Sequence, residues 1–442
     1  MLKRYNHCMK HLRVLLLFLL CCALFSQVFA QSDRPLAIVM TADGPIMPPM
    51  LEYIQRGIKA ADRENAEVLI IQLNTPGGSV ATMLDIVKEI RASNTPVIVY
   101  VSPKNAFAGS AGAPITFSAH ASAMAPETFI GAATPIDESG ANLNSDAKAK
   151  ASNAVKAAVR PYVEPRGTDA LQLAESMIDE AKAATADEAL AVKLIDFKVD
   201  NVDDLLEALD GFTVQMNDGP RTLNTSNAHT EALAMSFIEQ LLLFLTNPNI
   251  VFSLFSLGAM ALLFEISSPG GWVSGFVGVV CVALSIYGLG MLPINGFGII
   301  FLVTAFVLFI LDIKAPTHGA LTAAGAASFI IGALVLFNSA GTPQFQRVSV
   351  PLVVGTGLII GLFFFGILMF ALRAMRRPVS MGVESYIGKA GTAKMWDEAS
   401  GQVQMESELW SAEAIPDSEK ISKGDKVEVV QVEGLRLKVR KK

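Results

Sequence analysis

The chain has 442 residues, of which 52% are hydrophobic and 17% are charged. This charged fraction lies well below the roughly 25% of soluble domains. Long apolar runs explain the deficit, and the length suggests two or three domains. The formal net charge of −6 and the lack of a basic stripe with interleaved aromatic residues speak against nucleic-acid binding.

Residues 1–30 have the pattern of a signal peptide. Basic residues precede an apolar run over residues 14–25, and Ala30 ends an acceptable small-residue cleavage site. We therefore expect residues 1–30 to be removed and the following domain to be exported, with a retained N-terminal anchor as the alternative. Three of the four cysteines lie in this segment and Cys281 lies in a later apolar run, so the exported domain is expected to contain no disulfide.

Residues 31–212 alternate strand and helix patterns, which predicts an α/β domain with a largely parallel sheet. Strands are expected at residues 36–40, 67–73, 96–101 and 192–199, and helices at residues 50–64, 80–93, 151–162 and 171–190. A helix of small residues is expected from Ser110 towards His120, and a polar surface loop at residues 137–150. Residues 213–232 are polar and predict an irregular linker. A short interfacial helix is expected to follow it, and the two together extend to residue 248.

Residues 249–375 predict a membrane domain of about five helices. Each apolar run approaches the roughly 20 residues that cross a bilayer, and the runs cover residues 249–266, 272–292, 297–313, 320–337 and 351–372. Arg373, Arg376 and Arg377 follow the last run, which places that end in the cytoplasm by the positive-inside rule. Short alternating strands over residues 380–442 predict a small closed β-barrel.

Two short motifs indicate an acyl-transfer site. Gly77 and Gly78 follow a buried-strand pattern, and Ser110 lies among residues with almost no side chain. A serine nucleophile needs space, backbone N–H groups that stabilise an oxyanion, and a base. The motifs can provide the first two, so the base must come from elsewhere in the chain.

The exported domain contains a single histidine, His120, ten residues after Ser110. On one helix this separation is about 15 Å, too long for a hydrogen bond, so His120 is expected to be a core or surface residue. One histidine and no cysteine leave no zinc site. A lysine desolvated in an apolar pocket can act as the base, and the candidates are Lys148, Lys150 and Lys156. Helical periodicity places Lys150 with Ala154 and Ala157, and Lys148 with Ser152 and Val155, and leaves the choice open.

The motif Asn74-Thr75-Pro76-Gly77-Gly78-Ser79, followed by Gly109-Ser110-Ala111-Gly112, resembles the long-form NfeD-like membrane proteases. The resemblance implies a ClpP/crotonase-like protease domain, a multi-span membrane domain and a C-terminal OB-fold barrel. It implies that Ser110 is the nucleophile and that the N–H groups of Gly78 and Ala111 are the oxyanion donors. Gly77 belongs to the same oxyanion and substrate-binding turn. Lys150 begins a Lys-x-x-Asn motif upstream of Arg166-Gly167, and the resemblance therefore favours it over Lys148 as the base.

The resemblance also implies an activity and partners. We expect a serine endopeptidase that needs no cofactor or metal, cleaves hydrophobic peptide segments, and works with stomatin-like (SPFH) proteins at the plasma membrane. Its protease domain would be extracytoplasmic, its C-terminal domain cytoplasmic, and the protein a homo-oligomer by analogy with ClpP. Two alternatives are a non-catalytic scaffold for stomatin-like proteins and a crotonase-type acyl-CoA enzyme, which export from the cytoplasm argues against.

Overall fold

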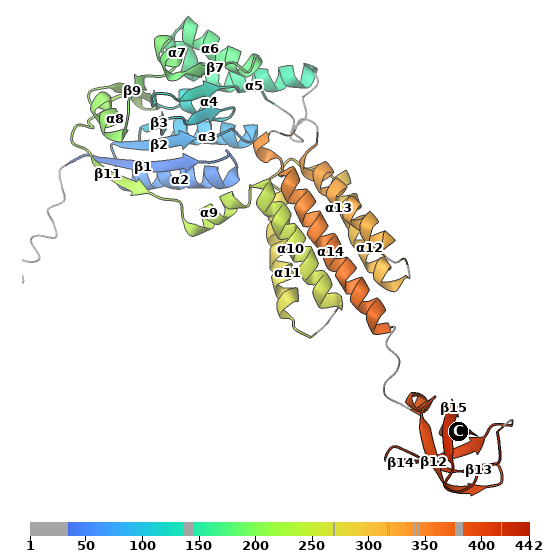
Figure 1. Ribbon diagram of the computed structural model, residues 1–442. Helices are drawn as coiled ribbons and strands as arrows, with labels where there is room; N and C mark the ends of the chain where they lie inside the picture. The colour runs from blue at the N-terminus through green and yellow to red at the C-terminus, as the bar shows by residue number, and fades with distance from the viewer. Residues whose placement is uncertain are drawn as a thin grey trace, which may run out of the picture. The chain divides into compact units, whose positions relative to one another are not determined.

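The computed structural model describes residues 34–135, 145–267, 270–315, 317, 319–339, 342, 344–375, 383–416 and 418–442. The predicted signal peptide and most of the predicted polar loop lie outside these residues. The chain, whose helices and strands are labelled in Figure 1, forms two compact units. One unit extends to Phe306 and includes Ala326–Ile360, and the other contains Val307–Gly325 and Gly361–Lys442.

The centre of the α/β domain is a six-stranded sheet in which all neighbouring strands are parallel. Its order is β11-β1-β2-β3-β5-β8. Continuous apolar runs such as Val-Ile-Val-Tyr-Val in β3 explain this, because a parallel sheet is covered on both faces. The strands are β1 (Leu36–Asp43), β2 (Val68–Asn74), β3 (Val97–Val101), β5 (Ala121–Met124), β8 (Phe197–Lys198) and β11 (His229–Leu233).

Two separate apolar clusters cover the two faces of this sheet. In the helix α2 (Pro48–Arg63), Met50, Ile54 and Ala61 recur at helical spacing and are buried, so one stripe of the helix faces the sheet. The first cluster also contains residues of α3 (Val80–Ala92), α5 (Ser145–Val163) and α6 (Thr168–Asp179). The second contains residues of α8 (Val202–Leu209) and of the strand β9 (Thr213–Met216), together with Leu223, which directly follows the strand β10 (Gly219–Thr222).

A second, three-stranded sheet connects to the carboxyl end of the first. It has the order β4-β6-β7 and consists of β4 (Phe107–Gly109), β6 (Phe129–Gly131) and β7 (Ala183–Thr185). Thr75, directly after β2, forms a bridge with Ala108 of β4. The short helices α4 (Gly112–Phe117) and α7 (Ala186–Ala191) follow β4 and β7. The turn after β2 and the turn after β4 are thereby brought side by side.

The predicted helix from Ser110 to His120 is wrong in its extent. The helix α4 ends at Phe117, and the N–H of His120 donates to the carbonyl oxygen of Val97 at 3.0 Å as the chain enters β5. Small apolar residues continue through both elements, and such a run does not distinguish a helix from a buried strand by its periodicity.

The prediction of an irregular linker at residues 213–232 is also wrong. The hairpin β9–β10 turns at Asn217-Asp218, directly before Gly219 with a φ of +128°, and β11 adds a parallel edge strand beside β1. In β9 every second residue is exposed, and in β11 four of the five residues are exposed, which explains the polar composition of the segment.

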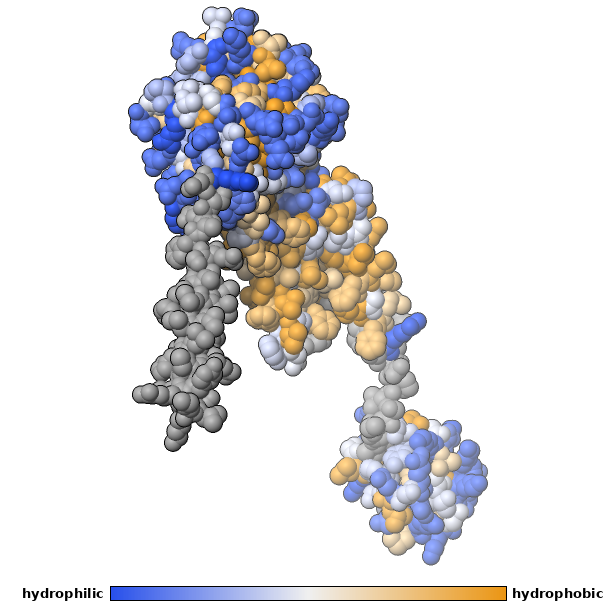
Figure 2. Space-filling view, turned by 90° about the vertical axis from the view of Figure 1, so that its left-hand side faces the viewer, coloured by the Kyte–Doolittle hydropathy of each residue, from blue (hydrophilic) through white to orange (hydrophobic). Residues whose placement is uncertain are grey.

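Five apolar helices follow α9 (Phe237–Phe244) and confirm the predicted helical runs. They are α10 (Pro248–Ser267), α11 (Val273–Leu289), α12 (Phe297–Lys314), α13 (Ala320–Phe337) and α14 (Val350–Met375). In the described residues, α10, α13 and α14 are long and apolar enough to cross a membrane, and α11 and α12 have shorter apolar stretches. Figure 2 shows hydrophobic residues concentrated on this helical part of the visible face. The count of five spans stays a prediction.

The C-terminal strands form a closed barrel with the order β12-β13-β14-β16-β15. Alternate residues point inwards, and Val403, Val427, Val429 and Leu437 are almost fully buried. The strands are β12 (Ala390–Asp397), β13 (Ser400–Met405), β14 (Glu408–Ala414), β15 (Lys426–Glu433) and β16 (Arg436–Lys441). With the α/β domain, the apolar helices and this barrel, the predicted fold class is confirmed.

Candidate active site

The turn after β2 is held by the side chain of Thr75, which is buried. Its Oγ1 accepts a hydrogen bond from the N–H of Gly77 at 3.0 Å. The backbone of Thr75 pairs with β4: its N–H donates to the carbonyl oxygen of Phe107 at 2.7 Å, and its own oxygen accepts from the N–H of Gly109 at 2.9 Å. Thr75 therefore fixes the glycine turn to the strand that leads to Ser110.

Ser110 lies directly after β4 in a left-handed backbone conformation, with a φ of +48°. This conformation is uncommon for a residue with a Cβ atom, and such strain is often found at functional sites. The N–H of Ser110 donates to the carbonyl oxygen of Gly131 at 2.8 Å. A sharp turn at a strand end, with its backbone fixed by a neighbouring strand, presents the Ser110 hydroxyl outside the sheet.

The two predicted motifs meet at close contact. A Cβ atom added at Gly77, where φ is +117°, would lie 2.5 Å from the Cβ and 3.0 Å from the Oγ of Ser110. A Cβ atom at Gly78 would lie 2.1 Å from the carbonyl oxygen of Ile46. Both positions therefore require glycine, because a side chain at Gly78 would collide with the backbone of Ile46 and one at Gly77 would collide with the side chain of Ser110.

Backbone N–H groups beside Ser110 are available for an oxyanion. In the turn, the N–H of Ser79 donates to Ile46, and beyond Ser110 the N–H of Ala113 donates to the serine carbonyl. In the part of the chain that the structure describes, no backbone bond outside helices and strands has the N–H of Gly78 or of Ala111 as its donor. Two donors beside a serine are what an oxyanion hole requires.

Ser110, Gly78 and Ala111 line a cavity of about 560 Å³. Its walls come from three regions of the chain, and none of the described residues that line it is charged. The α/β domain contributes mainly Met47, Pro48, Ser79–Met83, Pro114, Ala132–Pro135 and Val155; the loop after α11 contributes Gly290–Pro293; and the segment before α14 contributes Phe345 and Gln346.

His120, which the sequence predicted to be a core or surface residue, is buried in the core and lies at the opposite end of the sheet from Ser110. Its Nδ1 accepts a hydrogen bond from the N–H of Val97 at 3.1 Å, at the start of β3, whereas the serine lies beyond the carboxyl end of β2. The length of β3 alone separates these ends by about 13 Å. Burial, with the nearby Arg91 charge, lowers the pKa of His120 to about 3. This imidazole is neutral at physiological pH and is too far away to act as the base.

The three candidate lysines lie on α5. Lys156 forms an ion pair with Asp179 at 2.7 Å. Lys150 is exposed, on the helix face of the exposed Ala154 and Ala157, so its face does not desolvate the amine as expected. Lys148 is half-buried and lies on the face of the buried Ser152 and Val155. Neither Lys148 nor Lys150 is among the described residues that line the cavity.

The structure adds residues to the site that the sequence did not identify. Thr75 positions the turn, although in the sequence it is one polar residue of a loop motif. The hydroxyls of Thr134 and Ser152 are buried and have no hydrogen-bond partner among the described residues, and Thr134 lines the cavity. Nothing in the sequence singled out Phe345 or the loop after α11. Among the described residues no group of His, Cys, Asp or Glu side chains could hold a metal ion.

Comparison with known proteins matches three family profiles in succession. Residues 41–218 match the NfeD1b N-terminal domain, residues 249–370 the NfeD integral membrane domain, and residues 383–441 the NfeD-like C-terminal, partner-binding domain. The chain is similar to a solved structure from Pyrococcus horikoshii, the 1510-N membrane protease specific for a stomatin homolog. The identity is 31%, the match covers 49% of this chain and all of that one, and the TM-score is 0.43.

Two relatives match along nearly their whole length. The membrane protein NfeD1b of Bacillus subtilis is 27% identical over 94% of both chains. The membrane-bound protease PH1510 of Pyrococcus horikoshii is 33% identical over 96% of this chain and 97% of its own. On this full-length similarity, and with all three profiles matched in order, the chain belongs to the NfeD family of membrane proteins.

Proposed function

We propose that the chain is a membrane-bound serine endopeptidase. The observation that carries the proposal is the contact between Gly77 and Ser110, a strained serine that lines, with Gly78 and Ala111, a cavity whose described walls are uncharged. The name of the archaeal relative, a membrane-bound protease 33% identical over almost the whole chain, supports the same activity.

In the proposed reaction the Oγ of Ser110 attacks the peptide carbonyl carbon, and its proton passes to a neutral lysine amine. The negative charge that forms on the carbonyl oxygen is stabilised by the N–H groups of Gly78 and Ala111. The tetrahedral intermediate collapses, the C–N bond breaks, and the lysine returns the proton to the leaving amine. Water then hydrolyses the acyl-enzyme by the same route and releases Ser110.

Lys150 is proposed as the base. The support is its Lys-x-x-Asn motif upstream of Arg166-Gly167, while Lys156 is already paired with Asp179. Catalytic hydrogen bonds often tighten only in the substrate complex, so the exposed position of Lys150 is compatible with this role. Lys148 is the competing candidate, because the buried face of α5 includes it.

The finer features of the function are proposed from the resemblance and the relatives. The archaeal protein of similar structure is described as specific for a stomatin homolog, and we propose a stomatin-like partner or substrate for this chain, bound through the C-terminal barrel. The α/β domain is proposed to be extracytoplasmic after removal of residues 1–30, and the barrel cytoplasmic, in a homo-oligomer in the plasma membrane.

The test is cleavage of an apolar peptide library by the purified full-length protein in detergent. Ser110→Ala is expected to reduce kcat at least 1,000-fold, and Lys150→Ala to a similar extent. Lys148→Ala is the matched control and is expected to keep cleavage within about threefold. Full activity of Ser110→Ala would reject the proposed activity. Loss of activity in Lys148→Ala alone would transfer the role of the base to Lys148.

A further inference from the structure

The cavity at Ser110 is not formed by the α/β domain alone. Leu292 and Pro293 come from the loop between α11 and α12, and Phe345 comes from the segment between α13 and α14. These residues lie in the same compact unit as Ser110. Two loops that connect apolar helices therefore line the same cavity as the proposed nucleophile.

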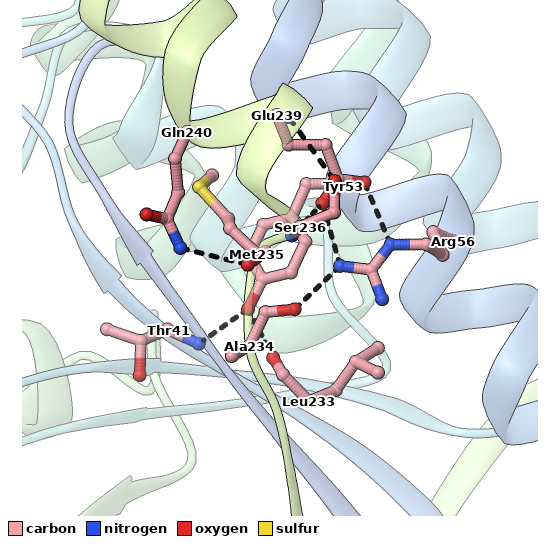
Figure 3. A network of polar contacts seen from close by, with 9 residues as sticks. All are labelled: Thr41, Tyr53, Arg56, Leu233, Ala234, Met235, Ser236, Glu239 and Gln240. Carbon is pink, nitrogen blue, oxygen red and sulfur yellow. Dashed lines mark hydrogen bonds and ion pairs between the residues drawn. The ribbon is translucent and has the colours of Figure 1, made fainter.

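A polar network joins α2 of the α/β domain to α9, the helix that precedes the first apolar helix (Figure 3). The guanidinium of Arg56 on α2 donates to both carboxylate oxygens of Glu239 on α9, at 2.8 and 2.7 Å, and to the carbonyl oxygen of Ala234 at 2.7 Å. The hydroxyl of Tyr53 donates to the carbonyl oxygen of Leu233 at 2.5 Å. These contacts fix the start of α9 to α2 on either side of the turn at Ser236.

The end of α9 in turn contacts the helix that precedes the first loop. A Cβ atom added at Gly288, near the end of α11, would lie 2.6 Å from the carbonyl oxygen of Leu245 and 2.4 Å from the side chain of Val251. Leu245 and Val251 are both buried. Because Gly288 has no side chain, the end of α11 packs closely against the start of α10. This contact also fixes the position of the loop Gly290–Pro293, which follows α11.

Side-chain amides fix the second loop. The N–H of Ser349 donates to the Oδ1 of Asn249 on α10 at 2.7 Å. The side chain of Asn338, after α13, both accepts from the N–H of Val348 and donates to its carbonyl oxygen, each at 2.9 Å. The segment that carries Phe345 is thus anchored to two helices of the apolar part.

We propose that these two loops are part of the substrate site and determine its specificity, which is an inference that rests on the proposed peptidase activity. Met291, Leu292, Pro293 and Phe345 provide an apolar wall for the side chains of the peptide segment that lies at Ser110. A charged substrate residue there would lose its hydration without gaining a partner. The two loops therefore discriminate against a charged substrate residue near the scissile bond.

A charge introduced into this wall tests the proposal. The full-length protein in detergent is given a fluorogenic peptide of Leu, Val and Ala residues, and a set of the same peptide with one Lys at each of the four positions nearest the scissile bond. Phe345 is 38% exposed, so Phe345→Glu is expected to fold. This variant is expected to lower kcat/KM for the apolar peptide at least tenfold, mainly through KM. For each protein, kcat/KM with a Lys peptide is divided by kcat/KM with the apolar peptide. For at least one Lys peptide this ratio is expected to be at least tenfold higher in Phe345→Glu than in the wild type.

The matched control is Phe297→Glu, at the start of α12. Phe297 is 71% exposed and is not among the described residues of the cavity wall, so this variant is expected to keep the ratio within twofold. Gln346→Glu adds a charge to the wall without a change of shape and is expected to move the ratio in the same direction as Phe345→Glu.

An unchanged ratio in both wall variants would overturn the proposal, and so would an equal change in Phe297→Glu. Either result leaves the peptidase activity intact if Ser110→Ala is inactive in the same assay. Undiminished cleavage by Ser110→Ala would instead reject the proposed activity itself.

Discussion

The backbone at Gly77 leaves no room for a side chain. An alanine there would adopt a φ near +117° and place its methyl group 2.5 Å from the Cβ of Ser110. The left-handed conformation costs about 1–2 kcal/mol, and the clash displaces the serine. Because a displacement of about 1 Å can reduce a rate 10²-fold, Gly77→Ala is expected to lower kcat at least 100-fold in the peptide assay.

Gly167 offers a control that separates strain from the clash. Its φ is +114°, and a Cβ atom added there would meet nothing within 4 Å. Gly167→Ala is expected to destabilise the α/β domain by the same ~1–2 kcal/mol while keeping kcat within twofold. Equal losses of activity in the two variants would contradict a specific role for the contact between Gly77 and Ser110.

His120 makes the stability of the α/β domain depend on pH. Its pKa is about 3 in the folded protein, lowered first by burial, and about 6.5 when unfolded. The unfolded state therefore binds the additional proton as the pH falls below about 6.5, and stability is lost towards pH 3. Between pH 6.5 and 5.0 the loss from this one group is about 2 kcal/mol.

The replacement His120→Gln removes this titration. Thermal unfolding of the full-length protein in detergent, measured at pH 7.5 and 5.0, is expected to show a smaller decrease in melting temperature for His120→Gln than for the wild type. His229 on β11 is exposed, and His229→Gln is expected to keep the decrease of the wild type. A wild-type decrease in His120→Gln would show that another group causes the pH dependence.

The proposed nucleophile and oxyanion donors could be predicted from the sequence, whereas the position of the base could not. Gly77, Gly78 and Ser110 can be recognised from the residues next to them in the sequence, because a glycine turn after a buried strand lies at the carboxyl end of the sheet in such a domain. Lys148 shares a face of α5 with Ser152 and Val155, and Lys150 shares a face with Ala154 and Ala157, so small side chains occur beside both lysines. Which face packs inwards is decided by Val155 and Val159 against the first cluster, which is a tertiary contact.

At the scale of elements, the ion pair that joins α2 to α9 predicts a measurable coupling. Arg56 and Glu239 form two parallel hydrogen bonds, and their side chains are 36% and 10% exposed. The hydrogen bond from Arg56 holds the pKa of Glu239 below its usual value. The pair therefore contributes fully above about pH 4.5 and loses its contribution as the pH falls below that value.

Thermal unfolding of Arg56→Ala, Glu239→Ala and the double variant at pH 7.5 is expected to give a coupling free energy of about 1 kcal/mol, as for a partly exposed bidentate pair. Arg56→Lys is expected to recover only part of it, because an ammonium group lacks the planar geometry. The pair Arg63 and Glu64, whose arginine is 75% exposed, is the control and is expected to show less coupling. Additive effects of the Arg56 and Glu239 variants would contradict the proposed coupling.

The elements that the sequence missed are those whose pattern is too short or too uniform. The strands β9 and β10 have four residues each, of which every second one is exposed, and β11 has five residues, of which four are exposed. Their composition is therefore that of a loop. Long periodic helices such as α2 and α3 were predicted within about two residues of their bounds, because a buried stripe over three or more turns has no alternative interpretation.

At the scale of the whole molecule, composition alone distinguished an α/β part, an apolar helical part and a β part. It could not indicate that the loops at Leu292 and Phe345 line the cavity of Ser110, because these residues are 182 and 235 positions away in the chain and carry no motif. Their role depends on the contacts of α9, Gly288 and Asn249, each of which forms only in the folded protein.

The barrel belongs to a different compact unit from Ser110, and this predicts that its proposed binding of a partner can be lost without loss of cleavage. Val429 on β15 is 1% exposed and its neighbour Val430 is 41% exposed. Val429→Asp places an unpaired carboxylate in the barrel core, at a cost of several kcal/mol, and is expected to unfold the barrel. Val430→Asp is expected to change stability by at most about 0.5 kcal/mol.

A stomatin-like protein co-expressed with the full-length chain is expected to be retained by Val430→Asp and lost by Val429→Asp in a pull-down from detergent extracts. Both variants are expected to cleave the apolar peptide within twofold of the wild type, since the Ser110 cavity contains no barrel residue among the described residues that line it. Retention of the partner by Val429→Asp would place the binding surface outside the barrel. Loss of peptide cleavage in Val429→Asp alone would show that the barrel contributes to catalysis as well as to binding.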